Sequence, residues 1–439
     1  MEQEKLMGFK PVSVTMEDML AEREERAAHS MSLTDRGTVV CMTMNLIGEY
    51  KVLAFSRAVF DTYCYVVNTA ISATYSEYLH KDTGDTAFFV TDLPPADVKR
   101  ICEMIEDAEP TGRLLDIDVF DENGEKLSRH SKRRCLICDK PAAECSRSRA
   151  HGVPAIRERT QFLLSDFYAK EVCAMAEQAL IDEVDTTPKP GLVDRNNSGA
   201  NPDMTYDMFI KSAEAISPYF GKMFTIAGCF SGIGAEMADV LRKVGMEAEH
   251  AMFAATGGVN THKGAIYSLG LMCAGAGFVL SYNGSFRDMV KAAAEIAFEL
   301  SYEITDQHTH GIEACKKYGV TGARGEAIGG FRTVLYAFDR IKYYADDRGL
   351  DTNTAYPLAI NDIMAVMSDT NVLHRAGMEG LEFMRSEAKA IAEMRENQRI
   401  DDMKELDEEL IKRNISPGGC ADALACALLM LKLEKLFHS

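Results

Sequence analysis

The stretch LLDIDVFDENGEK, residues 114–126, decides the fold of the first third of the chain. Its first half alternates apolar and acidic residues with the two-residue period of a β-strand. Leu115 and Ile117 therefore share one face of the predicted strand, and Asp116 and Asp118 share the other. At about 3.3 Å per residue, the two aspartate Cα atoms would lie roughly 6.6 Å apart.

The second half of this stretch predicts a hairpin. Its Asn-Gly pair, residues 123–124, supplies the two positive φ angles that a tight type I′ turn requires. We expect a second strand to follow the turn and to end near His130.

The residues around this stretch mix helical and strand periods. Helices are expected at 16–30, 56–79 and 94–108, and strands at 39–44 and 87–91. We therefore predict an α+β domain with a small antiparallel sheet over residues 1–155.

After residue 155 the strand signal fades and apolar residues recur at helical spacing. We expect helices at 164–180, 205–217, 233–246, 264–282, 287–303, 326–346, 357–367, 378–413 and 420–437. Residues 156–439 are thus predicted to form a second, predominantly all-α domain. The breaks between its helices are rich in Gly, Pro, Asn and Asp, and such loops often carry functional sites.

Composition excludes several classes of protein. The chain has 48 Lys and Arg against 67 Asp and Glu, so its net charge is −19, which disfavours nucleic-acid and anionic-membrane partners. Twelve cysteines in 439 residues are too few for a disulfide scaffold, and the first residues do not resemble a signal peptide, so we expect a reducing cytoplasm. The uncharged run 264–286 is interrupted by glycines, which favours a buried helix over a membrane span.

The carboxylates of Asp116 and Asp118 are the first candidate site. Two carboxylates at this spacing can converge on Mg²⁺, which clamps phosphate oxygens during in-line displacement. An edge strand with a solvated acidic face would have the same pattern, and the spacing alone leaves both readings open.

A basic segment follows at residues 129–149, where seven basic residues against two acidic ones give a net charge of +5. It could hold a polyphosphate. The same segment has the cysteine and histidine spacing Cys-x2-Cys-x6-Cys-x5-His, which suits a zinc knuckle, although reduced thiols in a packed loop would look alike. The zinc candidates are Cys135, Cys138, Cys145 and His151.

The runs GRLLDIDVFDENGEKLSR, 112–129, and RRCLICDKPAAECSRSRAH, 133–151, resemble the citrate lyase holo-acyl-carrier-protein synthase family. The resemblance covers roughly residues 14–155. It implies transfer of a phosphoribosyl-dephospho-coenzyme A group from its triphosphate form to a serine of the citrate lyase acyl carrier protein, with release of pyrophosphate. Asp116 and Asp118 would then hold Mg²⁺, and arginines would neutralise the leaving group. These arginines are Arg113, Arg129, Arg133 and Arg134.

The second domain lacks the two common nucleotide-binding fingerprints, because its Gly-x-Gly pairs have no third glycine in place and no Gly-Lys-Ser/Thr occurs. Its glycine-rich loop 256–264 precedes a long predicted helix, whose N-terminal amides could meet phosphate. Gly418 and Gly419 precede another helix in the same manner.

Five motifs of this domain follow, in order, those of the triphosphoribosyl-dephospho-coenzyme A synthase family. They are EVDTTPKPGLVDRNNSGANPDM (183–204), ATGGVNTHKGAIYSLGL (255–271), GVTGARGEA (319–327), SDTNVLHRAG (368–377) and RNISPGGCADAL (413–424). The resemblance covers about residues 160–432. It implies that 3′-dephospho-coenzyme A displaces adenine from the ribose of ATP, which makes the donor that the first domain would consume.

Glycosyl transfer of this kind needs negative charge near the sugar, a base for the attacking hydroxyl and groups that hold the triphosphate uncleaved. We expect His262, Glu326 and Asp369 to act in catalysis and Asp194, Asp203 and Asp422 to bind Mg²⁺. The substrate-binding candidates are Lys189, Arg195, Gly257, Gly258, Asn260, Thr261, Lys263, Arg324, Asn371, Gly418 and Gly419.

The sequence therefore predicts a bifunctional transferase that builds and attaches the prosthetic group of citrate lyase. Two alternatives remain at this stage. The chain could be an acyl-carrier-protein assembly factor without one or both activities, or its second half could be a phosphotransferase that uses the γ-phosphate of ATP.

Overall fold

Four strands form an antiparallel sheet in the order β2-β3-β1-β4. The computed structural model of the protein describes residues 6, 8–138, 140–302 and 310–437. The strands are β1 (Thr38–Met44), β2 (Tyr75–Leu79), β3 (Thr86–Thr91) and β4 (Leu115–Phe120). β1 pairs with β3 and β4, so Cys41 lies opposite both Phe88 and Asp118. β4 is therefore an edge strand.

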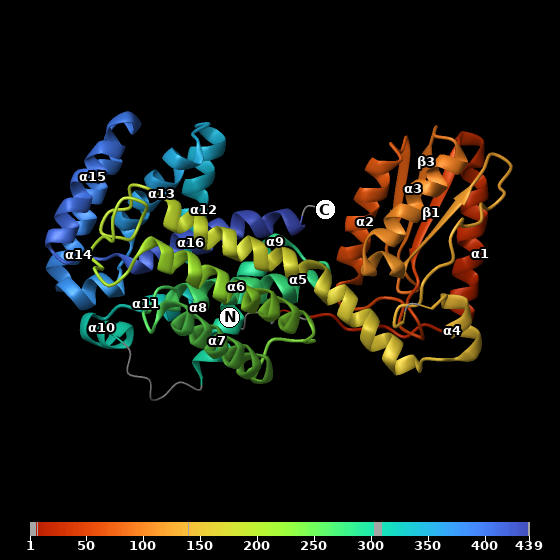
Figure 1. Ribbon diagram of the computed structural model, residues 1–439, viewed down its shortest axis with the longest axis horizontal. Coiled ribbons are helices and arrows are strands. Elements are labelled where there is room, and N and C mark those ends of the chain that lie inside the picture. The colour runs from red at the N-terminus through yellow and green to blue at the C-terminus, as the bar shows by residue number, and fades with distance from the viewer. Residues whose placement is uncertain (1–5, 7, 139, 303–309, 438–439) are drawn as a thin grey trace. The chain divides into compact units, whose positions relative to one another are not determined.

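Helices cover both faces of this sheet (Figure 1). On one face Leu33 of α1 packs with Val39, Cys41 and Phe88 of the strands, and α2 and α3 lie against the other. These helices are α1 (Met16–Leu33), α2 (Ser56–Ala70), α3 (Pro95–Ala108) and the short α4 (Ala142–Ser148). Together with Leu280–Gly284, residues Gly8–Tyr168 form one compact unit, which we call the sheet unit.

The free edge of β4 is bonded by side chains of α3 instead of a further strand. The backbone N–H of Ile117 donates to Glu106 at 3.1 Å, and the backbone C=O of Ile117 accepts from Lys99 at 3.1 Å. Unpaired strand edges invite association with other chains, so these two bonds also protect the edge.

A second compact unit, the helical unit, comprises the described residues of Met1–Met7, Ala169–Val279 and Ser285–His438. The helix α5 (Val153–Asp185) contributes residues to both units. The other helices are α6 (Tyr206–Gly228), α7 (Ala235–Thr256), α8 (Lys263–Leu280), α9 (Phe286–Ser301), α10 (His310–Tyr318), α11 (Gly322–Ile328), α12 (Arg332–Lys342), α13 (Thr352–Val366), α14 (Thr370–Ala392), α15 (Glu396–Lys412) and α16 (Gly418–Leu433).

Among the described residues, α8 is the one helix long and apolar enough to cross a membrane. However, 78% of it is buried inside the protein. Its apolar residues and those of α16 occupy the interior of the helical unit, so α8 is a core helix, as its glycines indicated.

The predicted fold class is confirmed: a small antiparallel sheet with helices is followed by a predominantly helical region. Three details of the prediction are wrong. The helix expected at 56–79 ends at Ala70, because the chain turns at Ser72, whose φ is 48°, and Tyr75–Leu79 pairs with β3. The second is that the helices expected at 326–346 and 378–413 are each interrupted, the first between α11 and α12 and the second between α14 and α15.

The third error concerns the hairpin after β4. The chain does turn back, but only Gly124 of the Asn-Gly pair has a positive φ, and one isolated bridge joins Phe120 to Lys126. Asp121 holds this wider turn by accepting hydrogen bonds from the backbone N–H groups of Asn123 and Glu125 at 2.9 and 2.8 Å. The following residues form no second strand.

Candidate functional sites

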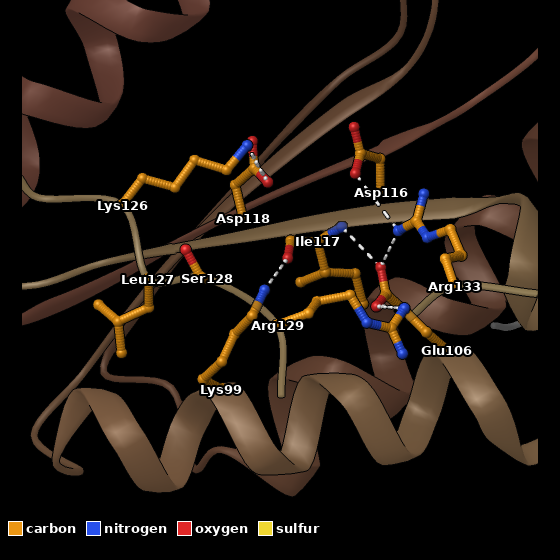
Figure 2. A pocket seen from close by; sticks show the side chains of 10 residues that line it. All are labelled: Lys99, Glu106, Asp116, Ile117, Asp118, Lys126, Leu127, Ser128, Arg129 and Arg133. Atoms are coloured by element: carbon orange, nitrogen blue, oxygen red, sulfur yellow. Dashed lines mark hydrogen bonds and ion pairs between the residues drawn. The ribbon is translucent and has the colours of Figure 1, made fainter. Parts of the chain in front are cut away.

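A pocket of about 330 Å³ lies beside β4 in the sheet unit (Figure 2). Four predicted site residues line it, together with residues that sequence reasoning missed. Its lining consists of Lys99, Glu106, Asp116, Ile117, Asp118, Lys126, Leu127, Ser128, Arg129 and Arg133. Four side chains are cationic and three are anionic, so the pocket suits a charged ligand.

The two aspartates of β4 share a face, as their spacing predicts, because the residues that alternate with them are buried. Each carboxylate has a cationic partner: Asp118 forms an ion pair with Lys126 at 2.6 Å, and Asp116 accepts a hydrogen bond from Arg133 at 3.3 Å. Half of the Asp116 side chain is exposed to solvent, so its carboxylate can reach a ligand in the pocket.

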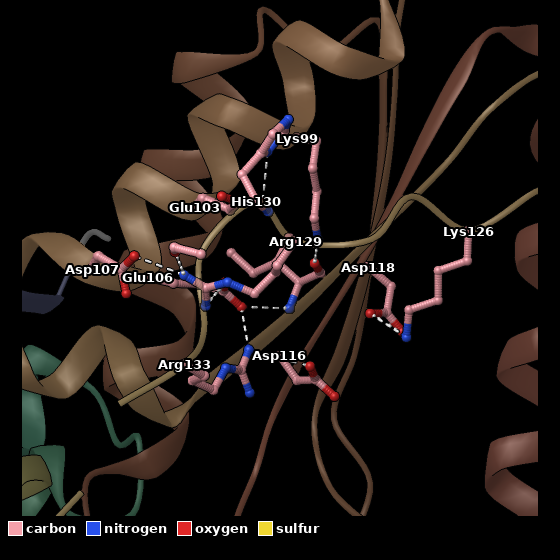
Figure 3. Close-up of polar contacts among 12 residues, drawn as sticks. Lys99, Glu103, Glu106, Asp107, Asp116, Asp118, Lys126, Arg129, His130 and Arg133 are labelled. Carbon is pink, nitrogen blue, oxygen red and sulfur yellow. Dashed lines mark hydrogen bonds and ion pairs between the residues drawn. The ribbon is translucent and has the colours of Figure 1, made fainter. Parts of the chain in front are cut away.

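Glu106 is the centre of the ionic network in Figure 3. Its side chain is 1% exposed, and it pairs with Arg129 at 2.8 Å and with Arg133 at 2.5 Å. Burial raises the pKa of Glu106, although the two guanidinium groups oppose this. Glu106 therefore fixes both arginines at the pocket wall, and Asp107 adds a second partner for Arg129 at 2.7 Å.

The other two predicted arginines do not line the pocket. Arg113 donates to the backbone carbonyl of Cys135 at 3.3 Å, and Arg134 is exposed in a short antiparallel bridge with Pro141. Cys135 belongs to the predicted zinc set, whose four ligand atoms all lie within 4.8 Å of one another.

In the helical unit, the loop after α5 is organised around two buried charged side chains. Lys189 is 1% exposed and pairs with Glu183 at 2.5 Å, a residue that the sequence did not single out. Asp194 accepts from the backbone N–H groups of Lys189, Asn196 and Asn197, so its oxygens hold the loop.

His262 is buried at the start of α8. Its Nδ1 lies 2.7 Å from the Ser212 hydroxyl, whereas its buried Nε2 has no hydrogen-bond partner among the described residues. Burial lowers its pKa to about 3, with a further contribution from the nearby charge of Lys189. The imidazole is therefore neutral at ordinary pH.

Two predicted carboxylates lie at helix N-termini. Asp369 is fully buried and caps α14, and it also accepts from the backbone N–H of Cys420 at 3.0 Å. Burial raises the pKa of Asp422 well above its usual value, and the negative charges of Glu183 and Asp369 raise it further. The charge of Lys189 thus acts on His262, and the charges of Glu183 and Asp369 act on Asp422. The ion pair of Lys189 with Glu183 links the two sets.

The remaining predicted residues are spread around this buried group. Lys263 pairs with Glu249 at 2.8 Å, Arg195 pairs with Asp185 at 2.7 Å, and Asn371 donates to the backbone carbonyl of Ser416 at 2.8 Å. Asn260 accepts from the Lys263 backbone N–H, Thr261 contacts Ser212, and Glu326 accepts from the Thr333 N–H. Both Gly257 and Gly258 have a positive φ angle. Gly418 packs beside Asn371, and Gly419 packs beside Asp369. Asp203 is exposed to solvent, whereas Arg324 is partly buried.

The three magnesium candidates of this unit do not form a preassembled metal site. Among the residues that the structure describes, the only group of three or more closely placed potential ligands is the cysteine and histidine set. Asp194, Asp203 and Asp422 are therefore not brought together among the described residues.

Comparison with known proteins gives matches over both units. Residues 169–439 match the family model of ATP:dephospho-CoA triphosphoribosyl transferase, and residues 14–167 match that of apo-citrate lyase phosphoribosyl-dephospho-CoA transferase. Protein CitXG of Haemophilus influenzae is 32% identical, with 96% of this chain and 97% of the relative covered. Protein CitXG of Leuconostoc mesenteroides subsp. cremoris is 29% identical over 94% and 95% of the two chains.

A third relative matches about two thirds of the chain. The 2-(5''-triphosphoribosyl)-3'-dephosphocoenzyme-A synthase of Haemophilus ducreyi is 34% identical, and the match spans 68% of this chain and 99% of the relative. The chain therefore belongs to the ATP:dephospho-CoA triphosphoribosyl transferase family, and it carries this domain in one polypeptide with an apo-citrate lyase phosphoribosyl-dephospho-CoA transferase domain.

Proposed function

We propose that the two units catalyse consecutive steps at separate sites. In the helical unit, ATP and 3′-dephospho-coenzyme A give 2′-(5″-triphosphoribosyl)-3′-dephospho-coenzyme A and adenine. In the sheet unit, this product is attached to a serine of the citrate lyase acyl carrier protein, and pyrophosphate is released. The observation that carries the proposal is that each unit holds its own set of converging charged side chains.

The buried carboxylates of the helical unit suit glycosyl transfer. When adenine leaves C1 of the ribose, positive charge develops on the sugar, and fixed negative charge nearby stabilises it. Asp369 would supply this charge from a buried position, because the backbone N–H groups of Asn371, Val372 and Cys420 donate to its carboxylate. Burial and the charges of Glu183 and Asp369 raise the pKa of Asp422, which favours its protonated form and suits proton exchange with a substrate hydroxyl.

Neutral His262 fits a role as a hydrogen-bonding group or base. Ser212 lies at Nδ1, so the unpartnered Nε2 remains for a substrate hydroxyl or an adenine nitrogen. Buried polar atoms normally have a partner in the functional state, which supports contact with substrate here. Burial, with a smaller contribution from the charge of Lys189, keeps the imidazole neutral. Lys189 and its partner Glu183 also fix the neighbouring loop.

The triphosphate would bind at the start of α8. Gly257 and Gly258 leave the backbone of this loop open, because no atom lies within 4 Å of where a side chain would begin. The half-exposed Lys263 then offers positive charge, and the positive end of the α8 dipole favours an anion at this loop. Arg324 would add a second cation.

In the sheet unit, Asp116 and Asp118 would hold Mg²⁺. They fit this role because both carboxylates line one pocket and supply the hard oxygen ligands that Mg²⁺ prefers. When bound, the ion would neutralise charge on the phosphate oxygens of the donor. Arg129, Arg133 and Lys126 bring positive charge to the same pocket for the leaving pyrophosphate.

The acceptor is an acyl carrier protein, for which the basic segment 129–149 offers electrostatic complementarity if the carrier is acidic. The reaction uses cytoplasmic nucleotides, and the free cysteines of the described chain fit that reducing compartment. We therefore place the enzyme in the cytoplasm, without a nucleic-acid or membrane partner.

The first step is tested by incubating the purified full chain with ATP, Mg²⁺ and dephospho-coenzyme A and separating the bases and nucleotides by chromatography. We expect free adenine that appears only when dephospho-coenzyme A is present. Release of ADP would instead indicate a phosphotransferase, and no turnover in folded protein would favour an assembly factor without this activity.

A further inference from the structure

Four potential metal ligands converge beside the pocket of the sheet unit, and neither proposed reaction uses them. Cys138 Sγ lies 3.5 Å from Cys145 Sγ and 3.3 Å from His151 Nε2. Cys135 completes the set, and all four ligand atoms lie within 4.8 Å of one another. Cys135 and Cys145 are buried, whereas Cys138 and His151 are partly exposed.

These distances match a tetrahedral zinc site. With Zn–S bonds of about 2.3 Å and Zn–N bonds of about 2.0 Å, the ligand atoms of a regular tetrahedron lie roughly 3.5–3.8 Å apart. Three thiolates and one imidazole select Zn²⁺ over Mg²⁺, which prefers oxygen. Since four protein ligands complete the coordination of zinc, the site would be structural and closed to substrate.

The local backbone already has the form that such a site needs. Cys135 and Lys140 are joined by a backbone hydrogen bond of 2.9 Å, which closes the loop that carries Cys138. The backbone N–H of Ile137 also donates to Cys135 Sγ at 3.5 Å, a bond that favours the thiolate form. Cys145 lies on α4, and the left-handed Arg149 after this helix turns the chain towards His151.

The segment has little else to hold it together. Between Phe120 and Phe162, the only buried apolar residues among those described are Cys135 and Cys145. A stretch that contains one short helix, α4, and has no apolar core needs a crosslink or a metal to stay ordered. The convergence of four ligands in this part of the chain is therefore best explained by a metal.

The same loop supports the pocket. Arg113 and Arg159 donate to the backbone carbonyls of Cys135 and Leu136 at 3.3 and 3.4 Å. Arg133, two residues before Cys135, is bonded through its backbone carbonyl to Ala142 and through its side chain to Asp116. The position of the Arg133 guanidinium in the pocket thus depends on the shape of this loop.

We propose that Cys135, Cys138, Cys145 and His151 bind one structural Zn²⁺, which orders residues 129–151 and so positions Arg133 at the transferase pocket. The metal takes no part in the chemistry. The ion contributes to folding, because the free energy of binding a structural zinc ion stabilises the ordered form of the chain around it.

The direct test is the zinc content of the full chain, purified under reducing conditions without a metal-chelate column and measured by plasma mass spectrometry. We expect about one zinc per chain in the wild type, and less than about a tenth in Cys138→Ser. The matched control is Cys229→Ser, at an exposed cysteine of the helical unit, and it should keep its zinc.

Two outcomes would overturn the proposal. One is wild-type protein that contains no zinc and takes up none from equimolar zinc chloride in reducing buffer. The other is a Cys138–Cys145 disulfide in freshly purified protein, because a disulfide would explain the convergence of these sulfurs without a metal. If Cys138→Ser does not fold, cobalt-loaded wild type decides the matter, since the proposal requires thiolate-to-cobalt charge-transfer absorption.

A second readout tests the ordering of the loop. The segment 129–149 contains seven Lys and Arg residues, so trypsin can cut it wherever it becomes accessible. Removing zinc with a chelator should raise the rate of cleavage within this segment at least about tenfold, which corresponds to about 1.4 kcal/mol of lost local stability. An unchanged rate would show that zinc does not order the loop.

Discussion

The carboxylate of Asp422 lies against the Cα atom of Gly264, so closely that a β-carbon on this glycine would overlap Asp422 Oδ2. Gly264 is the second residue of α8, and Asp422 lies in the first turns of α16. This approach brings the carboxylate to the loop where we place the triphosphate, and only glycine permits it.

Gly264→Ala is therefore expected to displace Asp422 and to lower the rate of adenine release by at least about tenfold, or about 1.4 kcal/mol of transition-state stabilisation. Attachment of preformed donor should be unchanged. Gly245→Ala, in α7, is the matched control, because its new β-carbon would meet only Met223 Cε at 3.8 Å. Equal activity of the two variants would show that the approach of Asp422 to α8 is not needed.

Lys263→Ala is expected to impair donor synthesis without affecting attachment when preformed donor is supplied, because it removes positive charge from the proposed triphosphate site. The impairment should appear mainly as a higher KM for ATP. Lys243→Ala is the control, since Lys243 also pairs with one carboxylate, Asp239, but lies within α7. Normal ATP turnover by the Lys263 variant would contradict the placement of the triphosphate.

Asp116→Asn should abolish attachment and leave donor synthesis intact, because the two sites belong to different units. The variant keeps the size of the side chain but removes its charge, and we expect a loss of at least about a hundredfold. Asp92→Asn, at an exposed position of the sheet unit, should transfer normally. Parallel loss of both activities in a folded Asp116 variant would argue against separate sites.

The buried His262 predicts a pH dependence of stability. Its pKa is about 3 in the folded protein and near 6.5 when unfolded, so below pH 6.5 the unfolded state binds more protons. Stability is then lost as the pH falls from 6.5 towards 3, by about 2 kcal/mol between pH 7 and pH 5.

His262→Gln should remove this part of the pH dependence. The free energy of unfolding of the helical unit is measured in urea at pH 7 and at pH 5, for the variant and for the wild type. If both proteins lose the same stability between these pH values, His262 is not held neutral in the fold.

The sequence predicted best those features that depend on local periodicity. The alternation around Asp116 and Asp118 was enough to place both carboxylates on one face of a strand, and the structure confirms the alternation. The strand Tyr75–Leu79 was missed because its residues also fit the preceding helix, and only pairing with β3 distinguishes the two.

Partners that are distant in sequence could not be predicted in the same way. Glu106 and Lys99 look like ordinary surface charges of an amphipathic helix, yet both are buried against the edge of β4. Glu183 lies in the last turn of α5 without any local signal, and its role depends on burial beside Lys189. The hairpin prediction was wrong because Asp121 stabilises a wider turn than Asn-Gly alone would favour.

The cysteine and histidine spacing predicted which residues form the cluster, but not whether the cluster binds a metal. It identified four residues that do converge, although Cys-x2-Cys was the only typical part of the pattern. The sequence could not show that the surrounding segment lacks an apolar core, and this is the observation that favours a metal over packed thiols.

The central claim is that one chain both makes and attaches the prosthetic group, and the most direct measurement is the intact mass of the acceptor. The full chain is incubated with apo-acyl carrier protein, ATP, Mg²⁺ and dephospho-coenzyme A, and the carrier is weighed by mass spectrometry. We predict a mass gain equal to one phosphoribosyl-dephospho-coenzyme A group, dependent on ATP and accompanied by free adenine. An unchanged carrier mass in the presence of folded enzyme and all substrates would contradict the account.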